Sequence, residues 1–267
     1  MPHTPSAASG DERLVGTDRV LAVLVELAGL PAGATLDEMA QRTGHPKPTV
    51  HRALASLCRA GLAVQDARGH YILGDEFLRL AFAHHEARPE HVRVRPLLER
   101  LSARFDETIH FAVLDGTEVV YRDKVDPAVG AVRLSSSIGG RNPAHSTGVG
   151  LVLLAARLRT LGEVEEWVGD RTLEQKTSRT VTTARRLHER LVEARERGFA
   201  VDDEENEPGI ACIAFPVFLG SPSEPSGAVS VSAVAYRTPL SALLAAAGDI
   251  HDIIHDTTRD TTLERNR

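Results

Sequence analysis

The residues best suited to bind a phosphate backbone are grouped between positions 41 and 70. Five basic residues lie in this segment against a single acid, Asp66, although the whole chain carries a formal net charge of −6. Lysine and arginine neutralise phosphates and donate hydrogen bonds to base edges. Binding to nucleic acid therefore depends more on the local charge of a surface than on the total charge of the chain. The segment therefore predicts a surface that could bind nucleic acid. The basic residues are Arg42, Lys47, Arg52, Arg59 and Arg68.

A helix from about residue 47 would hold most of these side chains. Val50, Leu54 and Leu57 recur at i, i+4 and i+7, the spacing of one buried helical face, so the opposite face would be exposed. Such a helix fits the major groove, with its first residues near base edges. The alternative is a solvated basic face that docks a protein partner. The predicted DNA-binding residues are Lys47, Thr49, His51, Arg52 and Ser56 on this helix, with Arg68 and His70 reaching a neighbouring phosphate or the minor groove.

Two other groups of residues could do chemistry but lack partners. His251 and His255 have the i, i+4 spacing of zinc ligands, yet two ligands leave half of a tetrahedral shell unfilled. The same residues also fit the polar, solvent-exposed face of an amphipathic helix. Cys212 would need a histidine to become a nucleophilic thiolate, and no local motif supplies one. Since phosphate loops, dinucleotide fingerprints and zinc-protease motifs are also absent from the sequence, we expect no enzyme, no catalytic residue, no metal and no cofactor.

The elements around the basic helix have a characteristic order. One helix begins at Thr17 and ends at Gly29, and a second begins at Thr35, whose spacing to Glu38 is that of a capping box. The basic helix comes third. Two short strands, at 62–64 and 71–73, then flank a glycine turn. Three helices followed by a hairpin predict a winged helix-turn-helix.

The rest of the chain has a mixed pattern of helices and strands. A helix at 77–86 leads out of the first module, and helices are also expected around Leu101, after Thr147, at 183–197 and through Ile254. We therefore predict an α+β protein with a disordered tail at 1–13, the winged helix at 14–76, a linker helix at 77–90, an α/β domain at 91–258 and a tail at 259–267. The predicted strands are 109–113, 119–121, 132–137, 199–202, 211–218 and 228–235, with loops at 138–143 and 220–227.

Composition narrows the class of protein. The 267 residues are 42% hydrophobic and 25% charged, which is typical of a globular chain and not of a disordered one. No apolar run approaches the roughly 18–20 residues of a membrane span, and no secretory signal is visible at the start. The two cysteines, Cys58 and Cys212, fit a reducing compartment. We expect a cytoplasmic protein that does not bind a membrane.

Three stretches of sequence resemble a known family. They are PKPTVHRALASLCRAGLA (46–63), NPAHSTGVGLVLLAA (142–156) and RGFAVDDEENEPGIACIAFPV (197–217) followed by AVSVSA. Through them the chain resembles the IclR family of bacterial transcriptional regulators, over roughly residues 14–256. The resemblance implies a GAF-like effector-binding domain, a homodimer or dimer of dimers, and binding to double-stranded operator DNA under the control of a small organic or aromatic acid. The chain departs from the family at Gly150-Leu151-Val152, where Gly-Lys-Ala is common, and in a longer loop at 220–227.

The resemblance also implies where the effector binds. A helix beginning near Ser146 would present free N–H groups at 148–150, and glycine there would let a ligand carboxylate approach closely. Serines two apart on a strand face one way, and Asp202 could accept a hydrogen bond from a ligand hydroxyl. Each residue also has an ordinary alternative role, as a small buried side chain, a sheet residue or a cap. The predicted effector-binding residues are Leu134, Gly148, Val149, Asp202, Cys212, Ser230 and Ser232.

Overall fold

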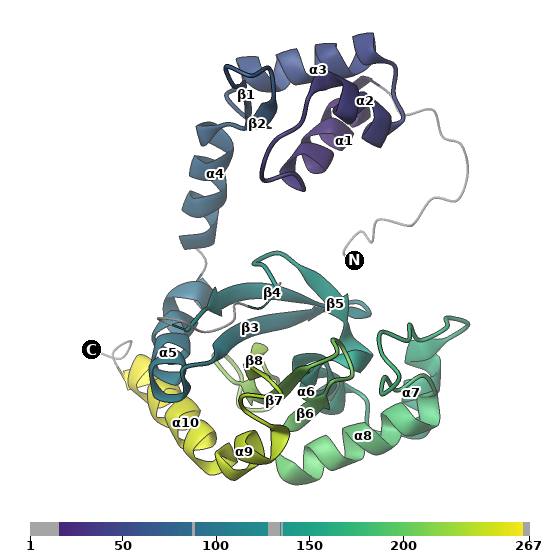
Figure 1. Cartoon of the computed structure of the whole chain (residues 1–267). Coiled ribbons are helices and arrows are strands. Elements are labelled where there is room, and N and C mark those ends of the chain that lie inside the picture. Colours follow the sequence, from purple (N-terminus) through teal and green to yellow (C-terminus); the bar gives the residue numbers. More distant parts are fainter. Residues whose placement is uncertain (1–15, 87–88, 128–133, 135, 264–267) are drawn as a thin grey trace. The chain divides into compact units, whose positions relative to one another are not determined.

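The chain forms two compact units, residues 1–87 and 88–267, in a computed structural model that describes residues 16–86, 89–127, 134 and 136–263 (Figure 1). Each unit is described by itself. The tail predicted at 1–13 lies outside the described residues. Residues 259–263, which were also expected to be tail, continue the last helix instead. Among the helices in these described ranges, none is both long enough and apolar enough to cross a bilayer.

Three helices and a two-stranded hairpin build the first unit in the predicted order. The predicted capping box is present, because the Glu38 N–H donates to Thr35 Oγ1 at 3.2 Å and the Thr35 N–H donates to Glu38 Oε2 at 2.8 Å. The winged helix-turn-helix is confirmed. Its elements are α1 (Gly16–Ala28), α2 (Leu36–Thr43), α3 (Lys47–Arg59), β1 (Ala63–Gln65) and β2 (Tyr71–Leu73), followed by α4 (Asp75–Glu86).

The core of this unit lies between α1, α2 and α3. Val50, Leu54 and Leu57 are almost fully buried, as their spacing predicted, and they pack with Leu27 of α1 and Met39 of α2. The basic face of α3 is therefore left outside.

The hairpin is joined to the helices through the backbone. Ala34, just before α2, exchanges two hydrogen bonds with Tyr71 of β2, at 3.0 and 2.7 Å. Gly33 has φ +75°, and a Cβ there would lie 2.5 Å from Ile72 Cγ2, so both its backbone and its surroundings require glycine. The hairpin is thereby held against the helices.

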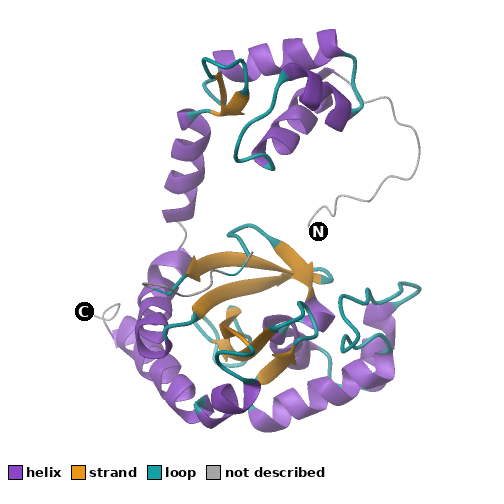
Figure 2. Ribbon diagram, viewed as in Figure 1, coloured by secondary structure: helices purple, strands orange, loops and turns teal. Residues whose placement is uncertain are grey.

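A six-stranded antiparallel sheet forms the centre of the second unit (Figure 2). The strand order is β5-β4-β3-β8-β7-β6, and the loop predicted at 220–227 joins β7 to β8. The strands are β3 (Thr108–Asp115), β4 (Glu118–Val125), β5 (Arg141–Pro143), β6 (Ala200–Asp203), β7 (Ile210–Val217) and β8 (Gly227–Val234).

Helices cover both faces of the sheet, each over a separate core. Alternate side chains of a strand point to opposite faces, so Val229 and Val231 join one core while Ser230 and Ser232 face the other side. The first layer holds α5 (Pro89–Phe105), α9 (Leu240–Ala245) and α10 (Ala247–Leu263). The second holds α6 (Gly148–Arg157), α7 (Leu161–Val168) and α8 (Ala184–Arg197), and a 3₁₀ turn, η1 (Ala144–Ser146), precedes α6.

Several expected elements differ in the second unit. The strand predicted at 132–137 is wrong where it can be checked: Leu134, Ser136 and Ser137 form no strand, and 132, 133 and 135 lie outside the described residues. Lys124 Nζ donates to the carbonyls of Leu134 and Ser136, at 3.0 and 2.8 Å, in place of a strand partner. The loop predicted at 138–143 includes β5, α7 was not predicted, and the single closing helix is divided at Ala246.

Candidate functional site

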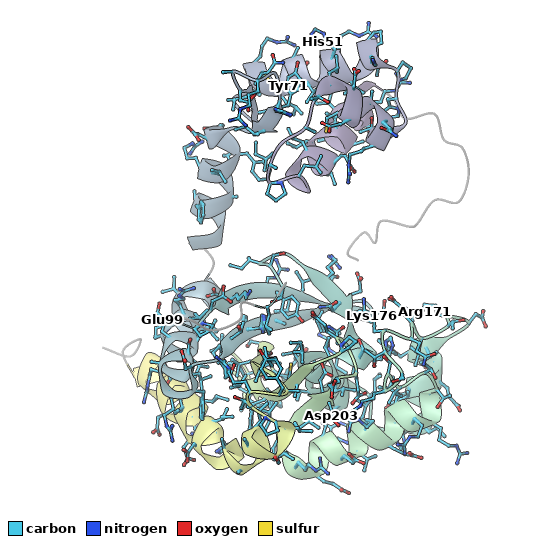
Figure 3. All side chains as sticks on the ribbon, in the orientation of Figure 1. His51, Tyr71, Glu99, Arg171, Lys176 and Asp203 are labelled. Carbon is cyan, nitrogen blue, oxygen red and sulfur yellow. The ribbon has the colours of Figure 1, made fainter. Side chains whose placement is uncertain are left out.

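The outer face of α3 is basic and open to solvent. Lys47, His51 and Arg52 are exposed, while Thr49 and Ser56 are partly buried beside them. Figure 3 shows His51 on the side of α3 away from α1 and α2. No side chain caps the helix at Pro46, and a helix N-terminus attracts phosphate. This face therefore has the shape and charge that binding in a major groove requires.

Two of the predicted DNA-binding side chains have local partners. Lys47 Nζ lies 2.8 Å from Asp37 Oδ1, but both are exposed, and such a pair contributes at most about 1 kcal/mol. Ser56 Oγ donates to the Arg52 carbonyl at 3.0 Å and accepts from Arg59 Nη2 at 2.9 Å. Since its hydroxyl proton is already used inside α3, Ser56 is the weakest of the predicted contacts.

The turn between β1 and β2 is organised by Asp66. Its Oδ1 accepts from the N–H groups of His70, at 2.9 Å, and Arg68, at 2.8 Å, and these bonds lower the pKa of Asp66. The Arg68 side chain is exposed at the tip, whereas that of His70 is partly buried with Nδ1 3.8 Å from Asp66. A firmly held turn thus presents Arg68 to solvent.

A pocket of about 500 Å³ opens on the α6 side of the sheet. Because side chains alternate along β7 and β8, Cys212, Ser230 and Ser232 face this side of the sheet, while Ile213, Val229 and Val231 face the other. The start of α6 and the end of β6 complete the wall. All seven residues predicted to bind the effector line this pocket: Leu134, Gly148, Val149, Asp202, Cys212, Ser230 and Ser232.

The start of α6 differs from the prediction in one respect. The N–H of Gly150 is not free, because it donates to Thr147 Oγ1 at 3.1 Å. A Cβ on Gly150 would lie 2.1 Å from the Ala144 carbonyl oxygen, so glycine is needed here for packing and not for ligand approach. Gly148 and Val149 remain as the N–H groups that could meet an anion.

Asp202 is a buried carboxyl with a perturbed charge. Its Oδ1 accepts from the N–H groups of Glu205, at 2.7 Å, and Asn206, at 3.3 Å. Burial nevertheless raises the pKa of Asp202 to about 7, and the nearby charge of Glu205 raises it further. Arg190, which donates to Glu205 at 2.6 Å, offsets only part of this effect. Near neutral pH Asp202 can therefore donate a hydrogen bond as well as accept one.

Thirteen further lining residues were not predicted from the sequence, and five of them bear directly on the chemistry of the pocket. His110 of β3 could have been noticed as a polar residue within an alternating strand, but Lys176 and Ser136 come from segments without regular structure. Asn142 Nδ2 donates to Tyr121 Oη at 3.2 Å. Lys176 Nζ is 3.7 Å from its ion-pair partner Glu174, a loose contact that leaves its charge available to an anion in the pocket. The five are His110, Tyr121, Ser136, Asn142 and Lys176.

The geometry gives little support to catalysis or metal binding. Burial raises the pKa of the Cys212 thiol, which opposes thiolate formation. The single hydroxyl proton of Ser146 has two acceptors at 3.2 Å, the Pro143 carbonyl and Asn206 Oδ1, and the adjacent His145 Nε2 hydrogen-bonds to the Glu174 carbonyl. The rings of His251 and His255 are 5.6 Å apart on α10, and the described residues bring no third ligand to them.

Two family models match the chain. The model of the bacterial transcriptional regulator IclR C-terminal domain matches residues 91–258, and that of the IclR helix-turn-helix domain matches residues 16–67. The chain belongs to the IclR family. It is a DNA-binding transcriptional regulator, as the resemblance implied, and this function is favoured over the alternative in which the winged helix docks a protein partner.

Characterised IclR-family regulators are similar along most of their length. The transcriptional regulator BhcR of Paracoccus denitrificans is 34% identical over 221 residues, which cover 82% of this chain and 77% of BhcR. The Pca regulon regulatory protein of Pseudomonas putida is 30% identical over 216 residues, covering 80% of this chain and 73% of that protein.

Solved structures share the same architecture. A transcriptional regulator from Rhodococcus sp. RHA1 superposes with a TM-score of 0.77 at 26% identity, covering 92% of this chain and 96% of that one. An IclR homologue from Microbacterium hydrocarbonoxydans, complexed with 4-hydroxybenzoate, has a TM-score of 0.71 at 24% identity and covers 90% and 99% of the two chains. The likeness to the second structure concerns the fold.

Proposed function

We propose that this IclR-family chain binds operator DNA as a homodimer or dimer of dimers, and that a small organic or aromatic acid in the pocket controls its affinity. The observation that carries the proposal is the pocket itself, which is lined by all seven residues that the resemblance implied for the effector. Its volume of about 500 Å³ suits a small ligand. The 4-hydroxybenzoate complex of a homologue supports an aromatic acid as a candidate.

Exposed apolar side chains support an oligomer. Leu78 and Phe82 of α4 are 45% and 60% exposed, and their i, i+4 spacing puts them on one stripe. Leu21 and Val25 make a similar stripe on α1. Contiguous exposed apolar stripes of this kind are typical of surfaces that pack against another chain. A second copy of this chain is the partner that we propose.

Control of DNA binding needs only a modest energy difference. A tenfold change in operator affinity corresponds to about 1.4 kcal/mol of preference of the effector for one conformation. In a dimer, α4 and the contacts between subunits would set the spacing of the two α3 helices, which must match half-sites about 34 Å apart. We further propose that the protein works in the cytoplasm, where bacterial operators lie, and that it catalyses no reaction on the acid.

The test is a pair of binding measurements on the full-length chain. A gel shift with the DNA upstream of its own gene should give a specific band that weakens steeply as salt rises, because binding releases counterions. A thermal-shift screen of small organic acids should find one that raises the melting temperature. The proposal fails if no specific band forms, or if an acid that stabilises the protein leaves operator affinity unchanged at saturation.

A further inference from the structure

A chain of hydrogen bonds runs behind the pocket through His110. The imidazole is buried, with Nε2 2.7 Å from Ser136 Oγ and Nδ1 3.2 Å from Ser232 Oγ and 3.5 Å from Ser230 Oγ. The two serine hydroxyls are themselves 3.2 Å apart. Since all three serines line the pocket, His110 links one wall of it to another.

His110 is neutral in this setting. Burial, with the nearby positive charge of Lys124, lowers its pKa to about 3, and the carboxylate of Asp126 opposes this only in part. Besides these two groups, the Tyr121 ring packs against the imidazole at 4.8 Å. A neutral imidazole has one N–H donor and one bare nitrogen acceptor, so His110 must donate on one side and accept on the other.

The distances indicate which atom is the donor in each hydrogen bond of His110. A separation of 2.7 Å is the most common length for a hydroxyl donor, and it is the short limit of the 2.7–3.2 Å range of N–H donors. The shorter separation favours the Ser136 O–H as the donor to Nε2, and the proton on Nδ1 is then directed at Ser232 and Ser230. Lys124 holds Ser136 in place, because its Nζ donates to the Ser136 carbonyl at 2.8 Å and pairs with Asp126 at 3.0 Å.

We infer that His110 is a positioning residue: its Nδ1–H occupies an acceptor site on the serine pair, so that a serine hydroxyl proton points into the pocket. Two hydroxyl protons remain on Ser230 and Ser232, and their mutual hydrogen bond uses one of them. Cys212, opposite Ser232 on β7, also hydrogen-bonds to it, and in this arrangement the protonated thiol is the donor of that bond. The proton left over needs an acceptor. The uncharged end of the ligand therefore carries an oxygen that accepts a hydrogen bond, as a carbonyl, ether or hydroxyl oxygen does, an inference that rests on the proposed function for the acid itself.

Histidine NMR on the ligand-free, full-length chain tests the tautomer. With ¹⁵N-labelled histidine, and His110 assigned by its loss in His110→Gln, we expect Nδ1 protonated and Nε2 bare from pH 5.5 to 8. Ser136→Ala should let the Nε2–H form appear, whereas Ser137→Ala, the neighbouring serine, should change nothing. A proton on Nε2 in the wild type, an imidazole that titrates in this range, or an unaltered tautomer in Ser136→Ala would each overturn the assignment.

A matched pair of probes tests the ligand class. In thermal shift, 4-acetylbenzoate should stabilise the chain more than 4-isopropylbenzoate, which has a similar shape but no acceptor, and Ser230→Ala with Ser232→Ala should abolish the difference. Equal shifts for the two probes in the wild type would contradict the inference. If no acid in the wide screen stabilises the chain, the proposed function fails instead, while the NMR result still decides the role of His110.

Discussion

Burial controls the charge of the side chains around the pocket more than their neighbours do. It is the largest cause of the low pKa of His110, the raised pKa of the Cys212 thiol and the pKa of about 12 at Tyr121. These groups are therefore neutral at pH 7. Formal charge comes from other lining residues, among them Lys176 and Arg141, while the buried Asp202 changes its charge near pH 7. An acid with one charged and one uncharged polar end matches this division.

The raised pKa of Asp202 makes the stability of the chain depend on pH. Between about pH 4 and 7 the unfolded carboxyl loses its proton while the folded one keeps it, so the free energy of unfolding falls as pH rises. Asp202→Asn should remove this loss, because the amide oxygen can still accept from Glu205 and Asn206. We expect the free energy of unfolding of the variant to exceed that of the wild type by about 2–4 kcal/mol at pH 8.

Urea unfolding at pH 5, 6.5 and 8 measures this difference. The advantage of Asp202→Asn should grow with each step in pH. A difference that stays constant across the three values would show that ionisation of Asp202 is not its cause.

At the scale of elements, the periodicity of the sequence correctly predicted the faces of helices and strands that are buried. The buried stripe of α3, the alternation of β7 and β8 and the capping box of α2 were all readable, because each depends on residues close in sequence. Helix α7 was missed although Thr160 and Glu163 form a capping box at its start. The backbone at Leu134 and Ser136 could not be predicted, since Lys124, which donates to both of their carbonyls, belongs to strand β4. Pocket residues such as Lys176 come together only in the fold.

Two arginines should have different effects on operator binding. Arg52→Ala on α3 should lower specific affinity by about 1–3 kcal/mol and non-specific affinity much less, because base contacts carry the sequence preference. Arg68→Ala at the hairpin tip should weaken both alike and reduce the salt slope by about one, as expected for a phosphate contact.

Fluorescence anisotropy with operator and scrambled duplexes at several salt concentrations separates the two effects. Arg186→Ala, on α8 of the second unit, is the control and should change neither affinity. If Arg52→Ala and Arg68→Ala lose specific and non-specific binding in the same ratio, the assignment of α3 to base contacts is wrong.

The start of α6 should not tolerate a larger residue at Gly150. A Cβ there meets the backbone of Ala144 at 2.1 Å, so η1 must move, and we expect Gly150→Ala to cost about 2 kcal/mol or more. Gly162→Ala in α7 is the matched control. Its Cβ would meet nothing within 4 Å, and alanine favours a helix over glycine by up to about 1 kcal/mol. Chemical unfolding of both variants checks this, and equal stability would contradict it.

At the scale of the whole molecule, the proposed dimer would bind its operator through two copies of α3. Its two half-sites would then have to lie on one side of the duplex. Inserting about five base pairs between the half-sites turns one of them by half a helical turn, and inserting about ten restores the phase. We expect at least a tenfold loss of affinity for the first insertion and substantial recovery for the second.

Footprinting on the three operators, with the mass of the complex measured by light scattering, tests this phasing. An affinity that falls steadily with spacer length would favour independent binding of each winged helix over a rigid dimer.

The two faces of α3 share no residue: one side holds Val50, Leu54 and Leu57 in the core, and the other offers Lys47 and Arg52 to solvent. The residues that would select the DNA sequence are thus different from those that stabilise the fold. After a gene duplication, one copy can acquire a new regulon by exchanging a few surface side chains, without any compensating change inside the domain.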